Sequence, residues 1–418
     1  MTRRALAALA LCACSGTTGT IKLDLATAPG SHVLDAVDRL RVTLADQVIE
    51  ATRSDAGFDL ALELDATGAA GRLVVEGFDA AGTLVACGQS PRFPISAINA
   101  HVVVYVAAPR SINPAPSALA SARSEVAASA LDFGAVIAGG RDAAGAPSTS
   151  IAVYNAYDHS FVEGVPLPAP RASLAITATA SGQVYLFGGT GADGNPTGTL
   201  WRYDTTVAPN GAASALSDDP SLARSGQLFV PLADRYVITG TPALDLGAAA
   251  VTARTDIAGL PAVGASAVAG TALFAGTPIV RFQGTAFDTI AGNAPIDGVA
   301  QALVDSRVVF IGGASRDAIV VAADGTVSVI ADALATPRAH PVIAATARQL
   351  LVAGGTDATG APLASAELFD ATTFAPLGVI PMLARSGGFA IALPNDQILI
   401  GGGAPAATTL ELYTPEPP

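Results

Sequence analysis

The strongest constraint on the fold of this sequence is an internal repeat that begins after residue 120. Five units open with an arginine, and an apolar run that ends in glycine follows 16 or 17 positions later. The arginines are Arg123, Arg171, Arg224, Arg338 and Arg385. Their runs end at Gly139-Gly140, Gly188-Gly189, Gly240, Gly354-Gly355 and Gly401-Gly402, and two runs without an arginine end at Gly276 and Gly312-Gly313. Such repeats must stack on one another, because one unit cannot bury its own apolar faces.

The rest of each unit predicts four short strands. A turn rich in Asp, Gly and Pro follows the glycines, and then a strand that ends in an aromatic residue, as at Tyr154, Tyr203 and Phe369. Asp142, Asp193 and Asp357 in these turns are expected to shape hairpins rather than to bind calcium, since no dense carboxylates surround them. Four strands in roughly 40 to 50 residues are typical of a propeller blade. Seven glycine endings predict seven blades, and six is the alternative if the unit ending at Gly276 is not a blade.

Between residues 119 and 414 these features resemble the kelch repeat family, whose β-propellers include those of the galactose-oxidase type. The arginines and paired glycines recur in the repeat, which favours a scaffold role in which each arginine holds its blade to the neighbour through backbone carbonyls. A ring of arginines that receives carboxylates is the alternative. Kelch proteins that bind acidic peptides carry a second arginine two residues further on, and here those positions are Glu125, Ser173, Gly226, His340 and Gly387.

The last unit lacks its fourth strand, because it runs through Tyr413 and stops at Pro415. An open sheet edge invites aggregation. We therefore expect the segment 109–114, within the linker 109–118, to pair with that edge and close the ring. Residues 415–418 form a short tail.

Residues 21–108 contain short alternating segments, of which Phe58–Leu64 is the clearest. Six or seven such strands in fewer than about ninety residues predict a small β-sandwich. It resembles the immunoglobulin-like or fibronectin-like modules that follow bacterial lipoprotein signals.

The first residues predict export and a lipid anchor. Arg3 and Arg4 precede an apolar run that is too short to span a bilayer, and Leu11-Cys-Ala-Cys14 resembles a bacterial lipobox that departs from the commonest pattern only at Cys12. We expect 1–13 to be a signal peptide, Cys14 to be lipidated and 14–20 to be a tether, which places the protein in the bacterial envelope, on the outer membrane. An ordinary signal peptide, a buried N-terminal helix or a twin-arginine signal are the alternatives.

The amino-acid composition limits the classes of partner and ligand that the chain is expected to bind. The formal net charge of −13 gives no basic footprint for nucleic acid. Four histidines and three cysteines are little material for a metal site, so neither metal nor cofactor is expected. Cys87 is expected to pack in the interior, with an intermolecular disulfide as the alternative. The uncharged stretch 257–280 contains several Gly and Pro residues and predicts buried strands rather than a membrane span.

The sequence contains no catalytic motif, and no catalytic residue is assigned. A copper-radical oxidase would require paired histidines and a Tyr–Cys crosslink, whereas only His159 and His340 fall in the repeat region, and no cysteine does. We expect a monomeric, lipid-anchored binding or scaffold protein whose propeller recognises a protein or glycan and which meets the membrane through the anchor alone. The alternative is an exported enzyme, a hydrolase or sugar isomerase, with its site in the central channel.

Overall fold

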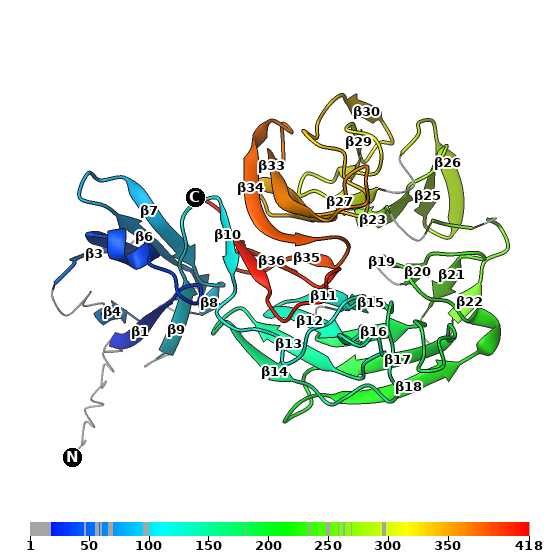
Figure 1. The fold of residues 1–418 in the computed structure, drawn as a ribbon, viewed down its shortest axis with the longest axis horizontal. Coiled ribbons are helices and arrows are strands. Elements are labelled where there is room, and N and C mark those ends of the chain that lie inside the picture. The colour runs from blue at the N-terminus through cyan, green and yellow to red at the C-terminus, as the bar shows by residue number, and fades with distance from the viewer. Residues whose placement is uncertain are drawn as a thin grey trace, which may run out of the picture.

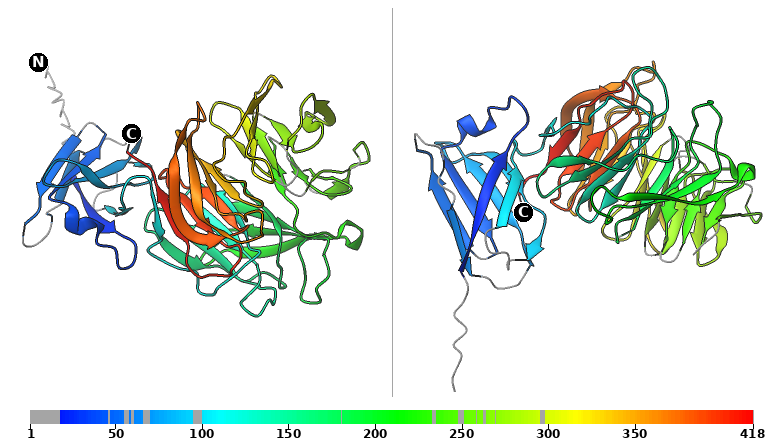
Figure 2. Two further views of the ribbon diagram at one scale, coloured as in Figure 1. Left: turned by 45° about the horizontal axis from the view of Figure 1, so that its top comes forward. Right: turned by 90° about the horizontal axis from the view of Figure 1, so that it is seen from below.

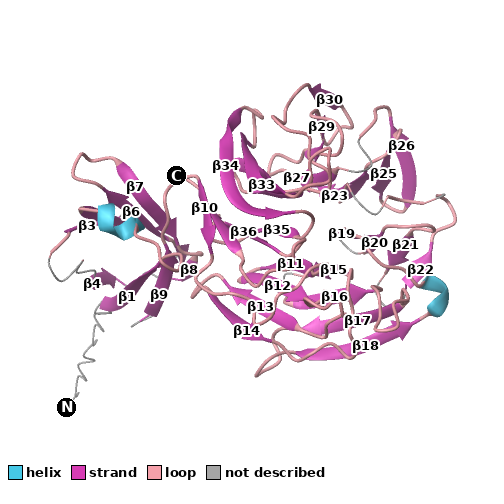
Figure 3. Ribbon diagram, in the orientation of Figure 1, coloured by secondary structure: helices cyan, strands magenta, loops and turns pink. Residues whose placement is uncertain are grey.

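The computed structural model describes residues 18–45, 47–54, 58, 61–65, 70–94, 100–179, 181–232, 235–247, 251–257, 259–261, 264–268, 270–294 and 298–417. These residues form strands and turns, with two short 3₁₀ helices, η1 (Val33–Ala36) and η2 (Pro220–Leu222) (Figure 3). The protein is therefore all-β, as the sequence predicts. No helix in the described ranges is both long and apolar enough to cross a membrane.

The described residues from Thr18 to Ala108 form the N-terminal module (Figure 1). Its strands are β1 (Thr18–Ala26), β2 (Arg39–Leu44), β3 (Gln47–Thr52), β4 (Ala61–Asp65), β5 (Ala70–Gly71), β6 (Leu73–Phe78), β7 (Leu84–Gln89), β8 (Phe93–Pro94) and β9 (Ala100–Tyr105). They make sheets in the orders β4-β1-β9, β3-β2-β6-β7 and β5-β8. Alternate residues of β2 and β6 are buried, and Leu40, Val42 and Val75 share one apolar core with Val104 of the three-stranded sheet.

The repeat region forms further four-stranded antiparallel sheets, each named here by its first strand. The β11 sheet has β11 (Ala127–Leu131), β12 (Gly134–Ala138), β13 (Ile151–Asn155) and β14 (Ser160–Glu163); the β15 sheet has β15 (Ala175–Ala178), β16 (Gln183–Phe187), β17 (Thr199–Asp204) and β18 (Ala212–Asp218); the β19 sheet has β19 (Phe229–Pro231), β20 (Tyr236–Ile238), β21 (Leu244–Leu246) and β22 (Val251–Ala253). The β23 sheet has β23 (Ala265–Val268), β24 (Thr271–Phe274), β25 (Ile279–Gln283) and β26 (Ala286–Ile290); the β27 sheet has β27 (Val299–Ala302), β28 (Val308–Ile311), β29 (Ala318–Val321) and β30 (Val327–Ile330); the β31 sheet has β31 (Val342–Ala345), β32 (Gln349–Ala353), β33 (Leu363–Asp370) and β34 (Pro376–Arg385). The β35 sheet has β35 (Phe389–Ala392), β36 (Ile398–Gly401), β37 (Glu411–Thr414) and β10 (Ser111–Pro114).

These sheets stand around a common centre in a propeller-like arrangement (Figures 1 and 2). The first strand of each sheet contacts the first strand of the next, and β35 contacts β11, so the inner strands form a closed ring. Apolar clusters fill the spaces between neighbouring sheets. Five of the third strands carry an aromatic residue near their end, whereas β21 and β29 do not. Tyr154, Tyr203 and Phe369 are buried in the clusters between sheets.

The ring is closed by β10. It pairs antiparallel with β37, from Ser111 opposite Thr414 to Pro114 opposite Glu411. This is the pairing that the sequence predicts for the edge of the last unit. Because β10 follows the N-terminal module and β37 lies near the end of the chain, one sheet contains both ends of the repeat region.

The uncharged stretch 257–280 contributes β23 and β24 to the β23 sheet. β24 is mostly buried, as expected, whereas the residues of β23 are half-buried. Leu273 and Phe274 of β24 are buried against the neighbouring sheets. The acidic turns have the predicted hairpin role. Asp142 accepts hydrogen bonds from the N–H groups of Ala144 and Ala146, and Asp357 makes the equivalent bonds to its own turn.

Candidate functional site

Four of the five repeated arginines are buried, and Arg224 is half-buried. The Nη1 atom of Arg123 donates to the carbonyl of Gly139 at 3.1 Å, and that of Arg338 donates to the carbonyl of Gly354 at 3.0 Å. Arg385 donates to Gly402 in the same way at 3.1 Å. Both Arg123 and Arg338 are only 1% exposed. Each of these side chains therefore bonds to the residue that follows the second strand of the sheet that it opens.

The main chain of the arginines makes the link to the preceding sheet. The N–H of Gly140 donates to the carbonyl of Arg171 at 2.9 Å, and the N–H of Gly355 donates to that of Arg385 at 2.9 Å. The same bond joins Gly189 to Arg224 and Gly313 to Arg338. The expectation that arginine side chains bridge neighbouring blades is thus corrected. Each of these arginines lies between two sheets. Its side chain donates to the sheet that it opens, and its carbonyl accepts a hydrogen bond from a glycine of the preceding sheet.

This close approach explains the glycines that follow β12, β16 and β32. Gly240 has a φ of 114° but does not meet an arginine carbonyl, and Gly276 has no positive φ. Gly139, Gly188 and Gly354 have φ values of 61°, 67° and 61°, in the left-handed region that favours glycine. A Cβ atom on Gly354 would lie 2.5 Å from the carbonyl oxygen of Arg385. The other members of the pairs also have positive φ; they are Gly140, Gly189, Gly312, Gly313 and Gly355.

The last glycine pair is shifted by one residue from the predicted Gly401-Gly402. Gly401 ends β36 without a positive φ, whereas Gly402 and Gly403 have φ values of 65° and 81°. Gly401 is required for packing instead, because a Cβ there would lie 2.1 Å from a methyl group of Leu410. The sequence alone did not reveal this shift, because residues 401–403 are all glycine.

Two buried glutamates complete the arginine network and were not assigned from the sequence. Glu367 lies 3.0 Å from Arg338, and Glu411 lies 2.6 Å from Arg385. Glu367 also accepts hydrogen bonds from the N–H groups of Ala335 and Thr336. Each glutamate stands two positions before the repeat aromatic, which is the signal that could have identified it. Because their side chains are 4% exposed or less, these pairs offer no binding surface.

The other arginines have different neighbours. Ala152 occupies the position of Glu367 in the β11 sheet, and burial lowers the pKa of Arg123. Trp201 occupies that position in the β15 sheet, where the guanidinium of Arg171 lies 4.7 Å from the ring centre. Arg224 donates to the carbonyls of Thr239 and Pro242. Each of the five arginine side chains therefore contacts a carbonyl, a carboxylate or an aromatic ring of the propeller-like ring itself.

The central channel opens into a well at the face where the inner strands begin. This cavity has a volume of about 240 Å³. Its lining comes from six sheets and consists of Ala128, Leu228, Gly264, Ala265, Val299, Ala300, Pro341, Val342, Ile343, Gly388, Phe389, Ala390 and Ile391. None of these described lining residues carries an ionisable side chain. We refer to this cavity as the channel well.

A backbone rim precedes the inner strands at this same face. Glu125, Ser173 and His340, which occupy the position of the second arginine in the kelch proteins that bind acidic peptides, have φ values of 50°, 52° and 49°. The N–H of Ser173 donates to the carbonyl of Glu125, and the N–H of Gly387 donates to that of His340. The Glu125 carboxylate also accepts from Ser173 Oγ at 2.8 Å and from Arg141 at 2.9 Å. The rim is thus polar and held in place, and the well behind it is apolar.

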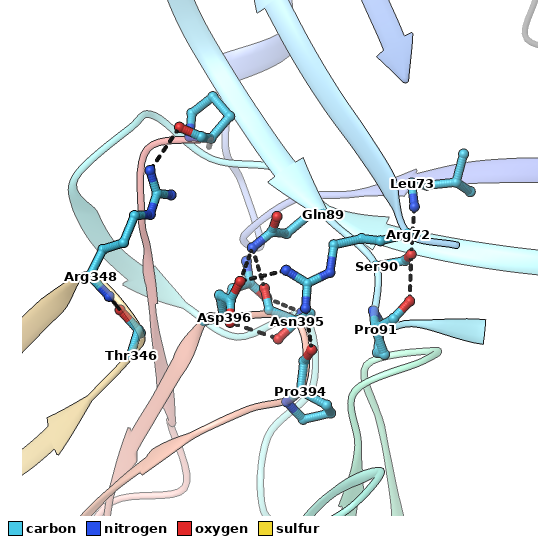
Figure 4. Close-up of polar contacts among 12 residues, drawn as sticks. Arg72, Leu73, Gln89, Ser90, Pro91, Thr346, Arg348, Pro394, Asn395 and Asp396 are labelled. Atoms are coloured by element: carbon cyan, nitrogen blue, oxygen red, sulfur yellow. Dashed lines mark hydrogen bonds and ion pairs between the residues drawn. The ribbon is translucent and has the colours of Figure 1, made fainter. Parts of the chain in front are cut away.

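A second polar cluster joins the N-terminal module to the ring (Figure 4). Arg72 makes an ion pair with Asp396 and donates to the carbonyl of Pro394 at 2.9 Å. The amide of Gln89 donates to the carbonyl of Asn395 at 2.9 Å and to Asp396 at 3.0 Å. The N-terminal module contributes the buried Gln89 and the ring contributes the buried Asn395. This cluster is therefore an internal contact between the module and the ring, and we call it the joint.

Two titratable groups are buried near this joint. His159 is 2% exposed, and its Nε2 accepts the backbone N–H of Tyr105 while its Nδ1 lies 2.7 Å from the Tyr154 hydroxyl. Burial lowers the pKa of His159 to about 4. Cys87 is 1% exposed, donates to the carbonyl of Pro415, and has its pKa raised to about 12 by burial, as expected for an interior residue. The contacts of His159 and of Cys87 therefore belong to the packed interior of the protein.

Two further predictions concern the lipidation site and metal binding. Cys14 lies outside the described residues. Within the described part of the chain, no group of three or more His, Cys, Asp and Glu residues could hold a metal ion. No protein-family model matches the chain, and no curated protein matches it as a relative.

Proposed function

We propose that this chain is a lipid-anchored protein of the bacterial envelope whose propeller binds a macromolecule through the channel well. The proposal takes the ring as a seven-bladed kelch-type propeller and the N-terminal module as an immunoglobulin-like β-sandwich. Support for the blades comes from the closed ring of inner strands and from the repeated arginine–glycine geometry. Support for the sandwich comes from the single apolar core that the two larger sheets share. The lipid anchor rests on the sequence around Cys14.

The channel well is the observation that carries the binding function. Hydrolases and isomerases move protons with side chains in contact with the substrate. The well offers apolar atoms behind a rim of backbone and polar groups, which is the usual make-up of a recognition pocket. The proposed role is therefore recognition without catalysis.

The volume of the well favours a protein over a free small molecule. Pockets for drug-sized ligands measure roughly 300 to 1,000 Å³, whereas a cavity of roughly 150 Å³ holds a benzene ring. At about 240 Å³ the well accepts one aromatic or large aliphatic side chain. A partner protein that inserts one such anchor would keep the rest of its interface on the surrounding loops. A glycan would instead place hydroxyl groups against apolar walls, at the cost of their hydrogen bonds to water.

Photo-crosslinking in intact cells tests this proposal. A benzophenone amino acid at His340, on the rim, should capture a partner, and the same probe at Val329 on the outer strand β30 should not. Ala300→Phe, which fills the well with an apolar side chain, should abolish the adduct from the rim probe. The function would have to be abandoned if both probes gave equal adducts or if the adduct persisted in Ala300→Phe.

A further inference from the structure

The first and last strands of the N-terminal module run side by side in the same direction. β1 pairs in parallel with β9, from Ile21 opposite Ala100 to Ala26 opposite Tyr105. The beginning of β1 lies beside the end of β4, where Thr18 is opposite Asp65. The two strands thus extend from the end of the module nearest Cys14 in sequence to the end marked by Ala26 and Tyr105.

The far ends of β1 and β9 are packed into the ring. The Tyr105 N–H donates to His159 at 3.3 Å. Ala28 and Tyr105 belong to the same buried cluster as Tyr154 and Leu410 of the ring. The three-stranded sheet is therefore attached to the ring at the end that lies away from the N-terminus (Figure 2).

The four-stranded sheet of the module is attached independently. Arg72, which precedes β6, and Gln89 of β7 bind the turn between β35 and β36 (Figure 4). Cys87 of β7 contacts the carbonyl of Pro415 in the C-terminal tail, and Arg348 of the ring donates to the carbonyl of Glu416 on the same tail at 2.6 Å. Because both sheets of the module are fixed, it cannot rotate about a single connecting strand.

We propose that the N-terminal module is a rigid spacer that holds the propeller at a fixed distance from the lipid surface. This inference rests on the anchor at Cys14 given under Proposed function. β1 has nine residues, so it extends for roughly 26 Å at 3.3 Å per residue. The four Cα-to-Cα steps from Cys14 to Thr18 add at most roughly 14 Å. The joint therefore lies no more than about 40 Å from the anchored residue.

Electrostatics favours an upright module. From Cys14 onward the chain has 20 basic and 35 acidic residues, and this net charge of −15 opposes contact of the module and the ring with a bilayer that carries anionic lipids. A short tether and a stiff joint together hold the propeller within a narrow range of distances from the lipid surface. A partner can then bind only where it lies within that range. Such confinement raises the effective concentration of a partner that shares the surface.

The test uses the mature chain from Cys14 onward, coupled by its Cys14 thiol to maleimide lipid in vesicles of phosphatidylcholine with phosphatidylglycerol. Cys87 does not compete, because it is buried. A donor dye on a non-natural residue at Val329 and an acceptor dye in the lipid report the distance by energy transfer. Chemical coupling replaces lipidation by the cell, so this experiment can succeed even if fatty-acid labelling of Cys14 fails.

The spacer predicts one narrow distribution of distances. Sixteen Gly/Ser residues inserted after Thr17 should make it about two-fold wider, because the root-mean-square length of a flexible chain grows as the square root of its length. The double variant Arg72→Ala, Gln89→Ala should also widen it, whereas Arg316→Ala, which removes an exposed pair with Asp332 away from the joint, should not. A wild-type distribution as wide as that of the insertion variant, or no widening in the double variant, would overturn the spacer.

Discussion

The glycines that end the second strands allow a prediction with an internal control. Gly354 and Gly360 both have positive φ, 61° and 83°. A Cβ on Gly354 would lie 2.5 Å from the Arg385 carbonyl oxygen, while a Cβ on Gly360 would have no neighbour within 4 Å. Gly354→Ala therefore tests both backbone conformation and close approach, and Gly360→Ala tests backbone conformation alone.

The expected costs follow from these two differences. A non-glycine residue in the left-handed region costs about 1–2 kcal/mol, and this applies to both variants. In Gly354→Ala the Arg385 carbonyl must also move away from the Gly355 N–H that it accepts. Leaving such a buried group unpaired costs about 1–3 kcal/mol. We expect Gly354→Ala to lose about 2–5 kcal/mol of unfolding free energy and Gly360→Ala about 1–2 kcal/mol.

Urea denaturation followed by circular dichroism measures this difference, provided that the slope of the transition is the same in all variants. Gly139→Ala and Gly145→Ala form a second matched pair, because a Cβ on Gly139 would lie 2.4 Å from the Arg171 carbonyl while Gly145 has open space. Equal destabilisation within each pair would refute the view that the arginine carbonyl is the reason for the glycine.

Three further predictions concern charge, pH and the anchor. Glu367→Ala should destabilise the ring by about 3–5 kcal/mol in denaturant titrations, since it leaves the Arg338 guanidinium buried without its carboxylate, and a loss below about 1 kcal/mol would contradict this. Burial lowers the pKa of His159 from 6.5 to about 4, so its stabilising contribution is complete above about pH 6.5 and is lost as the pH falls towards 4. Across that range wild type should lose about 3 kcal/mol more than His159→Leu, and parallel stability curves would argue against the buried neutral ring. Radiolabelled fatty acid should enter the wild type and not Cys14→Ser, and equal labelling would rule out the anchor.

Much of the ring could be predicted from the sequence, because its features are local. The apolar runs, the glycine endings and aromatic residues such as Tyr154 and Phe369 recur at intervals that fit one sheet each. The pairing of β10 with β37 could be predicted because the last unit is one strand short. Positive φ at Gly188 and Gly354 follows from the sharp turn after each second strand.

What the sequence did not reveal depends on contacts between distant segments. The bond from Glu367 to Arg338 joins residues 29 positions apart, and it requires the register of two strands. The joint between Arg72 and Asp396 spans 324 positions. The apolar character of the channel well arises only when inner strands of six sheets meet, because each strand alone contributes small residues such as Ala265 or Ala300.

The decisive measurement for recognition at the channel well is the structure of the complex captured by the probe at His340. We predict that one apolar side chain of the partner lies in the well, in contact with Val299 and Ala300, and that the rest of the interface covers the surrounding rim. A partner seated on the outer strands or on the N-terminal module, with the well unfilled, would contradict this function.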